Sequence, residues 1–326
     1  MSRKATQKKK KMTFPLIKNA TLGTKLLTFL LLLIFGIVFS SVLGVFVTII
    51  NGGSITYIKN LQIAQVLNQI IGFMLPAVFY AMLVQEKPFN YLGFKKIPTW
   101  SLLGIVAMFT VIPFLSMVND WNDAIVFPES MRALEEQLRS IQEKAEEIIV
   151  MFIAQGSLFS SLLIIAALAA VSEELLFRSV IQKMLIRIMK NAHVAIIVTA
   201  LLFSAFHGDF FGFFPRFLLG LMLGYMFWLS GSIFSTMLMH FVNNATIVML
   251  YYLNTRGFID IDVEHFGSTD NVLVIALSLI VTVAIFITCY RLNNKRHFDR
   301  PEGAEKSRDF SIPLRYTRND GTQLNN

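Results

Sequence analysis

The fold of this protein is decided by one stretch of its sequence, Val171-Ser172-Glu173-Glu174-Leu175-Leu176-Phe177-Arg178. The stretch places two adjacent carboxylates and a guanidinium inside an apolar run, about 157–185, that is long enough to span a membrane. Ionisable groups inside a bilayer cost at least about 2.5–3.5 kcal/mol each, and they occur mainly where function requires them. We therefore expect this stretch to form part of a functional site, with partners on neighbouring helices.

The composition of the whole chain is that of a helical membrane protein. Its 326 residues are 55% hydrophobic and only 15% charged, and the mean hydropathy is +0.60. A soluble domain carries about 25% charged residues. The single cysteine, Cys289, excludes an intramolecular disulfide and a zinc site built from cysteines. The net charge of +8 is concentrated in the two tails, which fits flanks facing anionic lipid better than binding to nucleic acid.

The apolar runs predict an all-α polytopic membrane protein with about eight transmembrane helices. The expected spans cover residues 26–50, 61–84, 100–118, 157–185, 193–206, 211–229, 232–252 and 272–290. Basic residues gather in the loops after the second and fourth spans, whereas the loops after the first, third, fifth and seventh are neutral or acidic. By the positive-inside rule, both termini are expected in the cytoplasm.

The segments outside the spans differ in composition from the spans. Residues 131–149 mix charged residues with apolar ones at helical spacing, which predicts an amphipathic helix beside the membrane or, equally well, a solvated loop helix. The basic C-terminal tail is expected to be poorly ordered. The predicted division is a basic N-terminal tail at 1–25, transmembrane helices with the amphipathic helix at 26–156, a core at 157–252, a loop and last span at 253–290, and the tail at 291–326.

Strongly polar side chains are few in the fourth to seventh spans and at their ends. They are Glu173, Glu174, Arg178, His207, Arg216, His240, Asn243 and Asn244. A rise of ~1.5 Å per residue puts His240 at ~12 Å, Glu173 at ~18 Å and His207 at ~21 Å from the cytoplasmic ends of their spans. Three different helices can therefore bring these side chains together near the middle of the bilayer.

The two carboxylates are expected to differ in role. Two adjacent carboxylates in a medium of low dielectric constant do not both ionise freely. Arg178 lies one helical turn from Glu174 and can hold it charged, which leaves Glu173 for chemistry. A carboxylate beside an imidazole can activate water for attack on a carbonyl, and His240 with Asn244 can stabilise the oxyanion. This inventory fits peptide hydrolysis without a nucleophilic serine or cysteine.

Other interpretations use the same side chains. Imidazole and carboxylate are ordinary ligands of Zn²⁺, so Glu173, His207 and His240 are also candidate metal ligands with an activated water in the fourth position. Intramembrane Glu, His and Arg form proton relays as well, so a proton-coupled transporter is the rival function. A structural role stays open for His207 as a wet interfacial histidine, and for His240 and Asn244 as helix-packing groups.

The order and spacing of these motifs resemble those of a known family. Glu173-Glu174-x-x-x-Arg178, Phe203-x-x-x-His207 and His240-x-x-x-Asn244 are similar to the successive motifs of the CPBP (CAAX protease and bacteriocin-processing, Abi) intramembrane proteases. That family includes Rce1-like CAAX prenyl endopeptidases and bacteriocin-immunity proteins. The resemblance covers about residues 162–251.

The resemblance implies eight helices around an intramembrane cavity and an endopeptidase in the plasma or inner membrane. Its substrate would be a membrane-associated or CAAX-like protein or peptide. The implied roles are Glu173 as the water-activating glutamate, His207 as its partner, His240 and Asn244 as the oxyanion site, and Glu174 with Arg178 as the pair that holds the cavity together. The family is described both as glutamate proteases, which need no cofactor, and as metalloproteases with Zn²⁺. A non-catalytic immunity or scaffold protein of the same fold is a further alternative.

Overall fold

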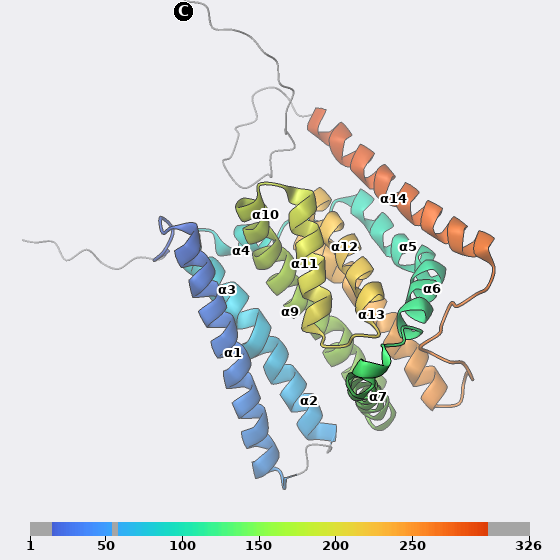
Figure 1. The fold of residues 1–326 in the computed structure, drawn as a ribbon. Coiled ribbons are helices and arrows are strands. Elements are labelled where there is room, and N and C mark those ends of the chain that lie inside the picture. The colour runs from blue at the N-terminus through green and yellow to red at the C-terminus, as the bar shows by residue number, and fades with distance from the viewer. Residues whose placement is uncertain (1–14, 54–57, 299–326) are drawn as a thin grey trace, which may run out of the picture.

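The computed structural model describes residues 15–53 and 58–298, and this part of the chain is helical, without a β-strand, as predicted (Figure 1). Within the described residues, six helical segments are long and apolar enough to cross a membrane. They are Leu22–Ile50, Ile58–Val84, Leu158–Met189, Phe213–Ser230, Ile233–Thr255 and Val272–Asn294. A bent pair, Thr99–Thr110 with Ile112–Asp123, makes a seventh if it is counted as one span.

The predicted number of eight spans is not confirmed. The fifth predicted span corresponds to α11 (Ala192–Phe206), which has 15 residues. At ~1.5 Å per residue it reaches ~22 Å, which is less than the ~30 Å of a bilayer core. The apolar pattern of this segment is therefore typical of a buried core helix as well as of a membrane span.

The first span, α1 (Leu22–Ile50), packs along a second span made of α2 (Ile58–Leu67), the π-helical segment η1 (Asn68–Met74) and α3 (Leu75–Val84). The helix begins four residues before the predicted apolar run because the Thr21 side chain accepts a hydrogen bond from the Thr24 backbone N–H at 3.2 Å. Gly36 lets the two spans approach closely, since a Cβ there would lie 2.6 Å from the Ile71 carbonyl oxygen.

The third predicted span is bent by 47°. It follows the short helix α4 (Pro88–Leu92) and consists of η2 (Thr99–Leu102), α5 (Leu103–Thr110) and α6 (Ile112–Asp123). Pro113 stands in the first turn of α6, and its ring cannot donate the backbone hydrogen bond that would join α6 to α5. The break therefore has a local cause in the sequence.

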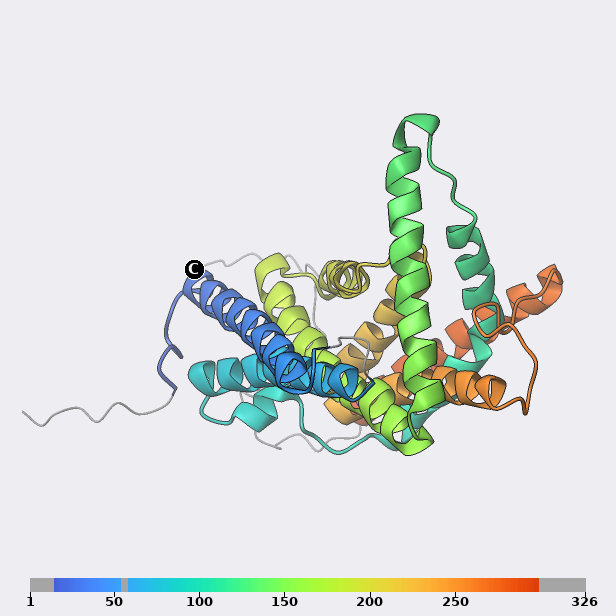
Figure 2. The ribbon, with the colours of Figure 1, turned by 90° about the horizontal axis from the view of Figure 1, so that it is seen from below.

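The amphipathic segment predicted at 131–149 is the helix α7 (Arg132–Gln155), preceded by the single turn η3 (Glu129–Met131). It is seen end-on near the lower end of the bundle in Figure 1 and along its full length in Figure 2, so it runs at a steep angle to the spans and extends beyond them. Its last turns bury Phe152 and Ile153. The helix is thus anchored to the bundle at one end.

The core span that carries the opening stretch is continuous but irregular. It runs through α8 (Leu158–Ser161), η4 (Leu162–Leu168), α9 (Ala169–Glu174), η5 (Leu175–Gln182) and α10 (Lys183–Met189). Two π-helical segments, η4 and η5, flank the short α9, and such segments are frequent at functional sites. The helix α13 (Ile233–Thr255) packs on α9, as does η1, whereas α11 and α12 (Phe213–Ser230) pack on η5.

The last helix, α14 (Val272–Phe298), packs on α5 and α6 at the edge of the bundle. The hydroxyls of Thr282 and Thr110 lie 2.9 Å apart across this contact. The helix continues eight residues past the predicted end at 290, because no glycine or proline interrupts it there. The last helix is therefore longer than the predicted span. The rest of the predicted C-terminal tail, and most of the N-terminal tail, lie outside the described residues.

Candidate functional site

A buried ion pair lies on the face of the core span that points into the bundle. Glu174 and Arg178 are both fully buried, and Arg178 Nε lies 3.2 Å from Glu174 Oε2. The spacing of four residues brings the two groups onto one face. Arg178 also stacks over the ring of Phe203, with its Cζ atom 4.7 Å from the centroid. The guanidinium is therefore held by a charge on its own span and by an aromatic ring on α11.

The second oxygen of Glu174 is occupied by a histidine. His240 on α13 places its Nδ1 atom 3.1 Å from Glu174 Oε1. An ionised carboxylate can only accept, so Nδ1 of this imidazole carries the hydrogen. The Nε2 atom of His240 is then directed at Glu173, 3.9 Å from its Oε2 atom.

His207 approaches the same carboxylate oxygen from α11. It follows the last residue of that helix, and its Nδ1 donates to the Phe203 carbonyl oxygen at 2.8 Å, which leaves Nε2 facing the site. Nε2 of His207 lies 3.9 Å from Glu173 Oε2. His207 is 32% exposed, whereas Glu173 is 12% and His240 3% exposed, so the cluster is open on the His207 side.

Phe203 is the residue to which both histidines and the arginine are packed. Its ring centroid is 4.9 Å from that of His207 and 5.8 Å from that of His240, in edge-to-face geometry. Sequence reasoning used Phe203 only as a motif position. The signal for a packing role was its spacing of four residues before His207.

Asn244 lies one turn after His240 on α13. Its Nδ2 donates to the Ile165 carbonyl oxygen at 3.4 Å, and its Oδ1 accepts from Asn243 Nδ2 at 3.1 Å. Because an amide has two N–H groups, one of them stays available for another acceptor. Asn243 was expected among the polar residues of this span, and the structure makes it the group that orients Asn244.

A cavity of about 220 Å³ lies beside the site, between α5, α6, α12, α13 and the loop 256–271. Most of its walls are apolar, and its polar lining residues are Ser116, Asn119, Arg216, Asn243, Thr246 and Glu264. Arg216 is held by Asp209, with Nη2 and Oδ2 2.5 Å apart. Asn243 thus connects the cavity to Asn244.

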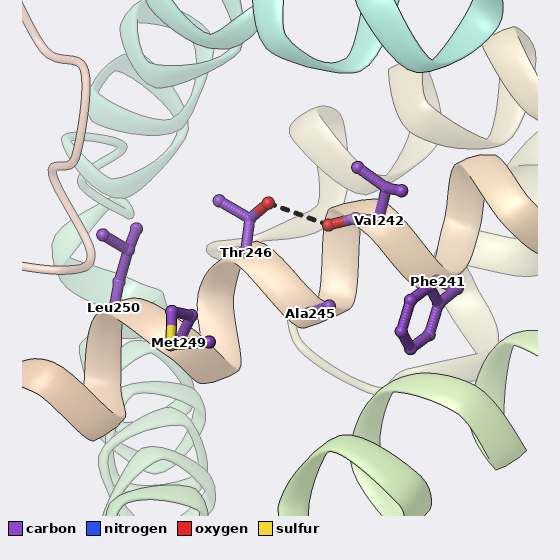
Figure 3. A pocket seen from close by; sticks show the side chains of 6 residues that line it. All are labelled: Phe241, Val242, Ala245, Thr246, Met249 and Leu250. Carbon is purple, nitrogen blue, oxygen red and sulfur yellow. Dashed lines mark hydrogen bonds between the residues drawn. The ribbon is translucent and has the colours of Figure 1, made fainter. Parts of the chain in front are cut away.

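Another cavity, of about 290 Å³, runs along α13 itself (Figure 3). It is lined by Phe241, Val242, Ala245, Thr246, Met249 and Leu250. Thr246 turns its hydroxyl back to the Val242 carbonyl oxygen at 2.8 Å, so its methyl group is left as lining (Figure 3). The two cavities share Thr246 and Leu250, which places them on adjoining sides of the helix that carries His240 and Asn244.

Two residues that sequence reasoning missed hold the turn next to Glu173. Ser172 donates from its hydroxyl to Gln69 Oε1, and both side chains are buried. The contact joins η1 of the second span to α9. Gln69 was visible in the sequence as a polar interruption of an apolar run, but nothing in the sequence showed which helix it faces.

The three candidate metal ligands do not fit a metal ion as the structure arranges them. The donor types are suitable, but both imidazole Nε2 atoms are 3.9 Å from Glu173 Oε2, whereas tetrahedral ligands bound to Zn²⁺ at ~2.0–2.1 Å are only ~3.3 Å apart. In the described part of the chain, no group of three or more His, Cys, Asp or Glu side chains is placed to hold a metal. No step is derived through a metal below.

These features define an all-helical integral membrane protein with a buried glutamate–histidine cluster. Residues 155–246, which contain all six predicted site residues, match the family described as type II CAAX prenyl endopeptidase Rce1-like. The predicted resemblance is thereby confirmed for this segment. The match supports a CAAX-type intramembrane endopeptidase, a hydrolase with a membrane-associated protein substrate, as the kind of function. No curated protein and no solved structure matches the chain.

Proposed function

We propose that this protein cleaves a peptide bond of a membrane-associated, CAAX-like protein or peptide with a water molecule activated by Glu173. One observation carries the proposal. The Oε2 atom of Glu173 is buried, has no hydrogen-bond partner among the described residues, and faces two imidazole Nε2 atoms at 3.9 Å each. A buried acceptor left without a partner is costly, so such an atom is retained where a ligand or reactant completes it.

The spacing of the three atoms suits a water molecule. A distance of 3.9 Å is too long for a direct hydrogen bond between carboxylate and imidazole, and it is short enough for one water to contact both groups. With Nδ1 protonated, a neutral His207 offers a lone pair at Nε2. Glu173 and His207 can then each accept one hydrogen of the water and turn its oxygen towards the substrate.

Hydrolysis requires one proton to move twice. Glu173 takes a proton from the water while the oxygen attacks the carbonyl carbon, and a tetrahedral oxyanion forms. The protonated Glu173 then gives this proton to the leaving nitrogen as the carbon–nitrogen bond breaks. The immediate products are a carboxylic acid, which keeps the second hydrogen of the water, and an amine. Because water is the nucleophile, no covalent enzyme intermediate is formed.

The oxyanion needs hydrogen-bond donors in a dry site. Because Glu174 occupies Nδ1 of His240, Nε2 can donate only when His240 is the imidazolium. Glu174 is thus tied to both Arg178 and His240. The remaining N–H of Asn244 is the second donor, and its amide is oriented by Asn243.

The cavity beside the site is the proposed place for an apolar side chain of the substrate next to the scissile bond. Its volume of about 220 Å³ and its apolar walls suit one or two such side chains. We place the protein in the plasma or inner membrane with both termini in the cytoplasm. This orientation is supported by the basic loops, and by α1 beginning and α14 ending at the same end of the bundle (Figure 1).

The test is cleavage of a quenched fluorescent peptide with a CAAX-like C-terminus, with and without a prenyl group, by protein in detergent or proteoliposomes. Glu173→Gln keeps the shape but cannot take a proton, so we expect kcat to fall by about 10²–10⁴-fold. Glu136→Gln, on an exposed position of α7, is the matched control and should cleave like the wild type.

Undiminished cleavage by Glu173→Gln at equal folded protein would refute the proposal. The same cleavage assay with a chelator tests whether a bound metal ion is needed for hydrolysis. Loss of cleavage with chelator and its recovery with Zn²⁺ would replace carboxylate-activated water by metal-bound water.

A further inference from the structure

A cluster of four cations lies at the end of the bundle where α1 begins and where α3 and α10 end (Figure 1). Its members are Lys25 on α1, Lys95 after α4, and Lys183 and Arg187 on α10. Lys183 is ten residues after Glu173, or ~15 Å along the helix. The cluster is therefore distinct from the glutamate–histidine site, and the mechanism proposed above does not use it.

Two of these cations share one aromatic ring. Lys183 donates from Nζ to the Tyr91 carbonyl oxygen and lies 5.0 Å from the ring centroids of both Tyr91 and Phe227. Arg187, one turn further along, places its Cζ atom 5.7 Å from the Tyr91 centroid. Like charges four residues apart on a helix repel each other, so this arrangement is unfavourable by itself.

The other two cations add to the same positive field. Lys25 is close enough to Arg187 for mutual repulsion, and Lys183 is close enough to both Lys95 and Arg187. Lys25 Nζ donates to the Lys18 carbonyl oxygen at 2.7 Å, and this acceptor carries no net charge.

Among the residues that the structure describes, no carboxylate pairs with Lys25, Lys95 or Lys183. Glu86, two residues beyond the end of α3, is bound to Lys18 at 2.7 Å. Since Lys25, Lys183 and Arg187 are only partly exposed, their charges are screened less by solvent than charges on an open surface. An anion bound between them would remove the repulsion.

The position of the cluster favours a lipid headgroup as the source of such an anion. Lys25 lies in the first turn of α1, and the exposed side chains that follow it on this helix are large and apolar, including Leu27 and Leu31 at 58% and 60% exposure. The cations thus stand where the exposed apolar surface of α1 begins, and cations at such a boundary meet lipid headgroups when the helix spans a membrane. We propose that Lys25, Lys183 and Arg187, with Lys95 at the rim, bind the phosphate of an anionic phospholipid whose acyl chains lie along α1.

This site joins α1 to the span that carries Glu173. A lipid phosphate held by Lys25 on one side and by Lys183 and Arg187 on the other would link the outermost N-terminal helix to α10. Such a lipid stabilises the folded protein by an amount that grows with the logarithm of its concentration above the Kd. Its binding can therefore be measured without any assay of cleavage.

The experiment uses the purified full-length protein in neutral detergent, titrated with short-chain phosphatidylglycerol and followed by native mass spectrometry and thermal unfolding. One cation near a lipid surface accounts for about a 5-fold change in affinity, so Lys25→Gln or Arg187→Gln should weaken binding about 5-fold and the double variant about 25-fold. Lys96→Gln, an exposed lysine at the same end, is the matched control and should bind like the wild type. The charge-conserving pair Lys25→Arg and Arg187→Lys should restore binding if the glutamine variants fold poorly.

Three results would overturn the assignment. Phosphatidylcholine binding as tightly as phosphatidylglycerol would show that the negative charge is not recognised. Unchanged binding in the double variant would place the lipid elsewhere. Inorganic phosphate binding as tightly as the lipid would identify a site for a free anion.

Discussion

The buried ion pair between Glu174 and Arg178 allows the sharpest test of how this fold is held together. The perturbation is Arg178→Met, which keeps much of the side-chain volume and removes the positive charge. Glu174 is then left fully buried, with Nδ1 of the His240 imidazole still 3.1 Å from its Oε1 atom.

The magnitude follows from the burial of both groups. Removing one member of a buried ion pair costs about 3–5 kcal/mol, because the other charge loses its compensation. His240 can still donate to Glu174, so we expect a value near the lower limit, about 3 kcal/mol. Glu174→Gln combined with Arg178→Met removes both charges and should recover part of this loss, giving a coupling energy of about 2 kcal/mol in the double-mutant cycle.

The assay is equilibrium unfolding in mixed micelles of a mild detergent and sodium dodecyl sulfate, followed by circular dichroism. Arg132→Met is the control, because it removes an exposed pair with Glu129, 64% and 81% exposed, and should cost less than about 1 kcal/mol. The reasoning is refuted if Arg178→Met unfolds within about 1 kcal/mol of the wild type, or if the two substitutions are simply additive.

Three further predictions concern the surroundings of the site. Burial and the neighbouring Glu146 raise the pKa of Glu264 from 4.5 to about 7, so the folded loop 256–271 favours the protonated carboxyl. The stability of this loop should therefore fall as the pH rises from about 4.5 to 7, by on the order of 1 kcal/mol after allowance for screening by solvent. Hydrogen exchange of the loop should show this loss, and Glu264→Gln should flatten it; an unchanged profile would contradict the assignment. Gly220→Val should destabilise the protein by about 1–3 kcal/mol in the same unfolding assay, because even a Cβ at this position would lie 3.1 Å from Ala200. A neutral effect would contradict the tight contact of α11 with α12. Asn243→Ala should lower kcat by about tenfold through the freed amide of Asn244, and an equal loss in the fraction of folded protein would show instead that it acts on stability.

Most of the helices could be predicted because apolar length is a local property of the chain. The first two spans and the sixth to eighth begin within about four residues of their predicted starts, since the apolar runs themselves define the segments. The departures also have local causes, namely the Thr21 cap and the bend at Pro113. The count of eight spans is not confirmed at α11, because an apolar pattern of 15 residues does not distinguish a core helix from a helix that crosses the membrane.

The arrangement of the candidate site could be predicted only in part from the sequence. The depth estimate brought Glu173, His207 and His240 to similar levels, and the structure places both imidazoles 3.9 Å from one oxygen of Glu173. The contact of His240 Nδ1 with Glu174 was not expected, because sequence reasoning paired Glu174 with Arg178 alone. That contact decides which nitrogen of His240 faces Glu173.

The sequence by itself determined that two acids and an arginine stand inside an apolar run, that Glu174 and Arg178 share a helix face, and that the tails are basic. Those properties follow from residue order and the helical repeat, which need no partner. Tertiary structure decided the rest. Which oxygen of each glutamate meets which imidazole nitrogen, which ring packs on Arg178, and which cations gather at Tyr91 all depend on the rotation of helices about their axes. That rotation is set by close packing between helices far apart in the chain.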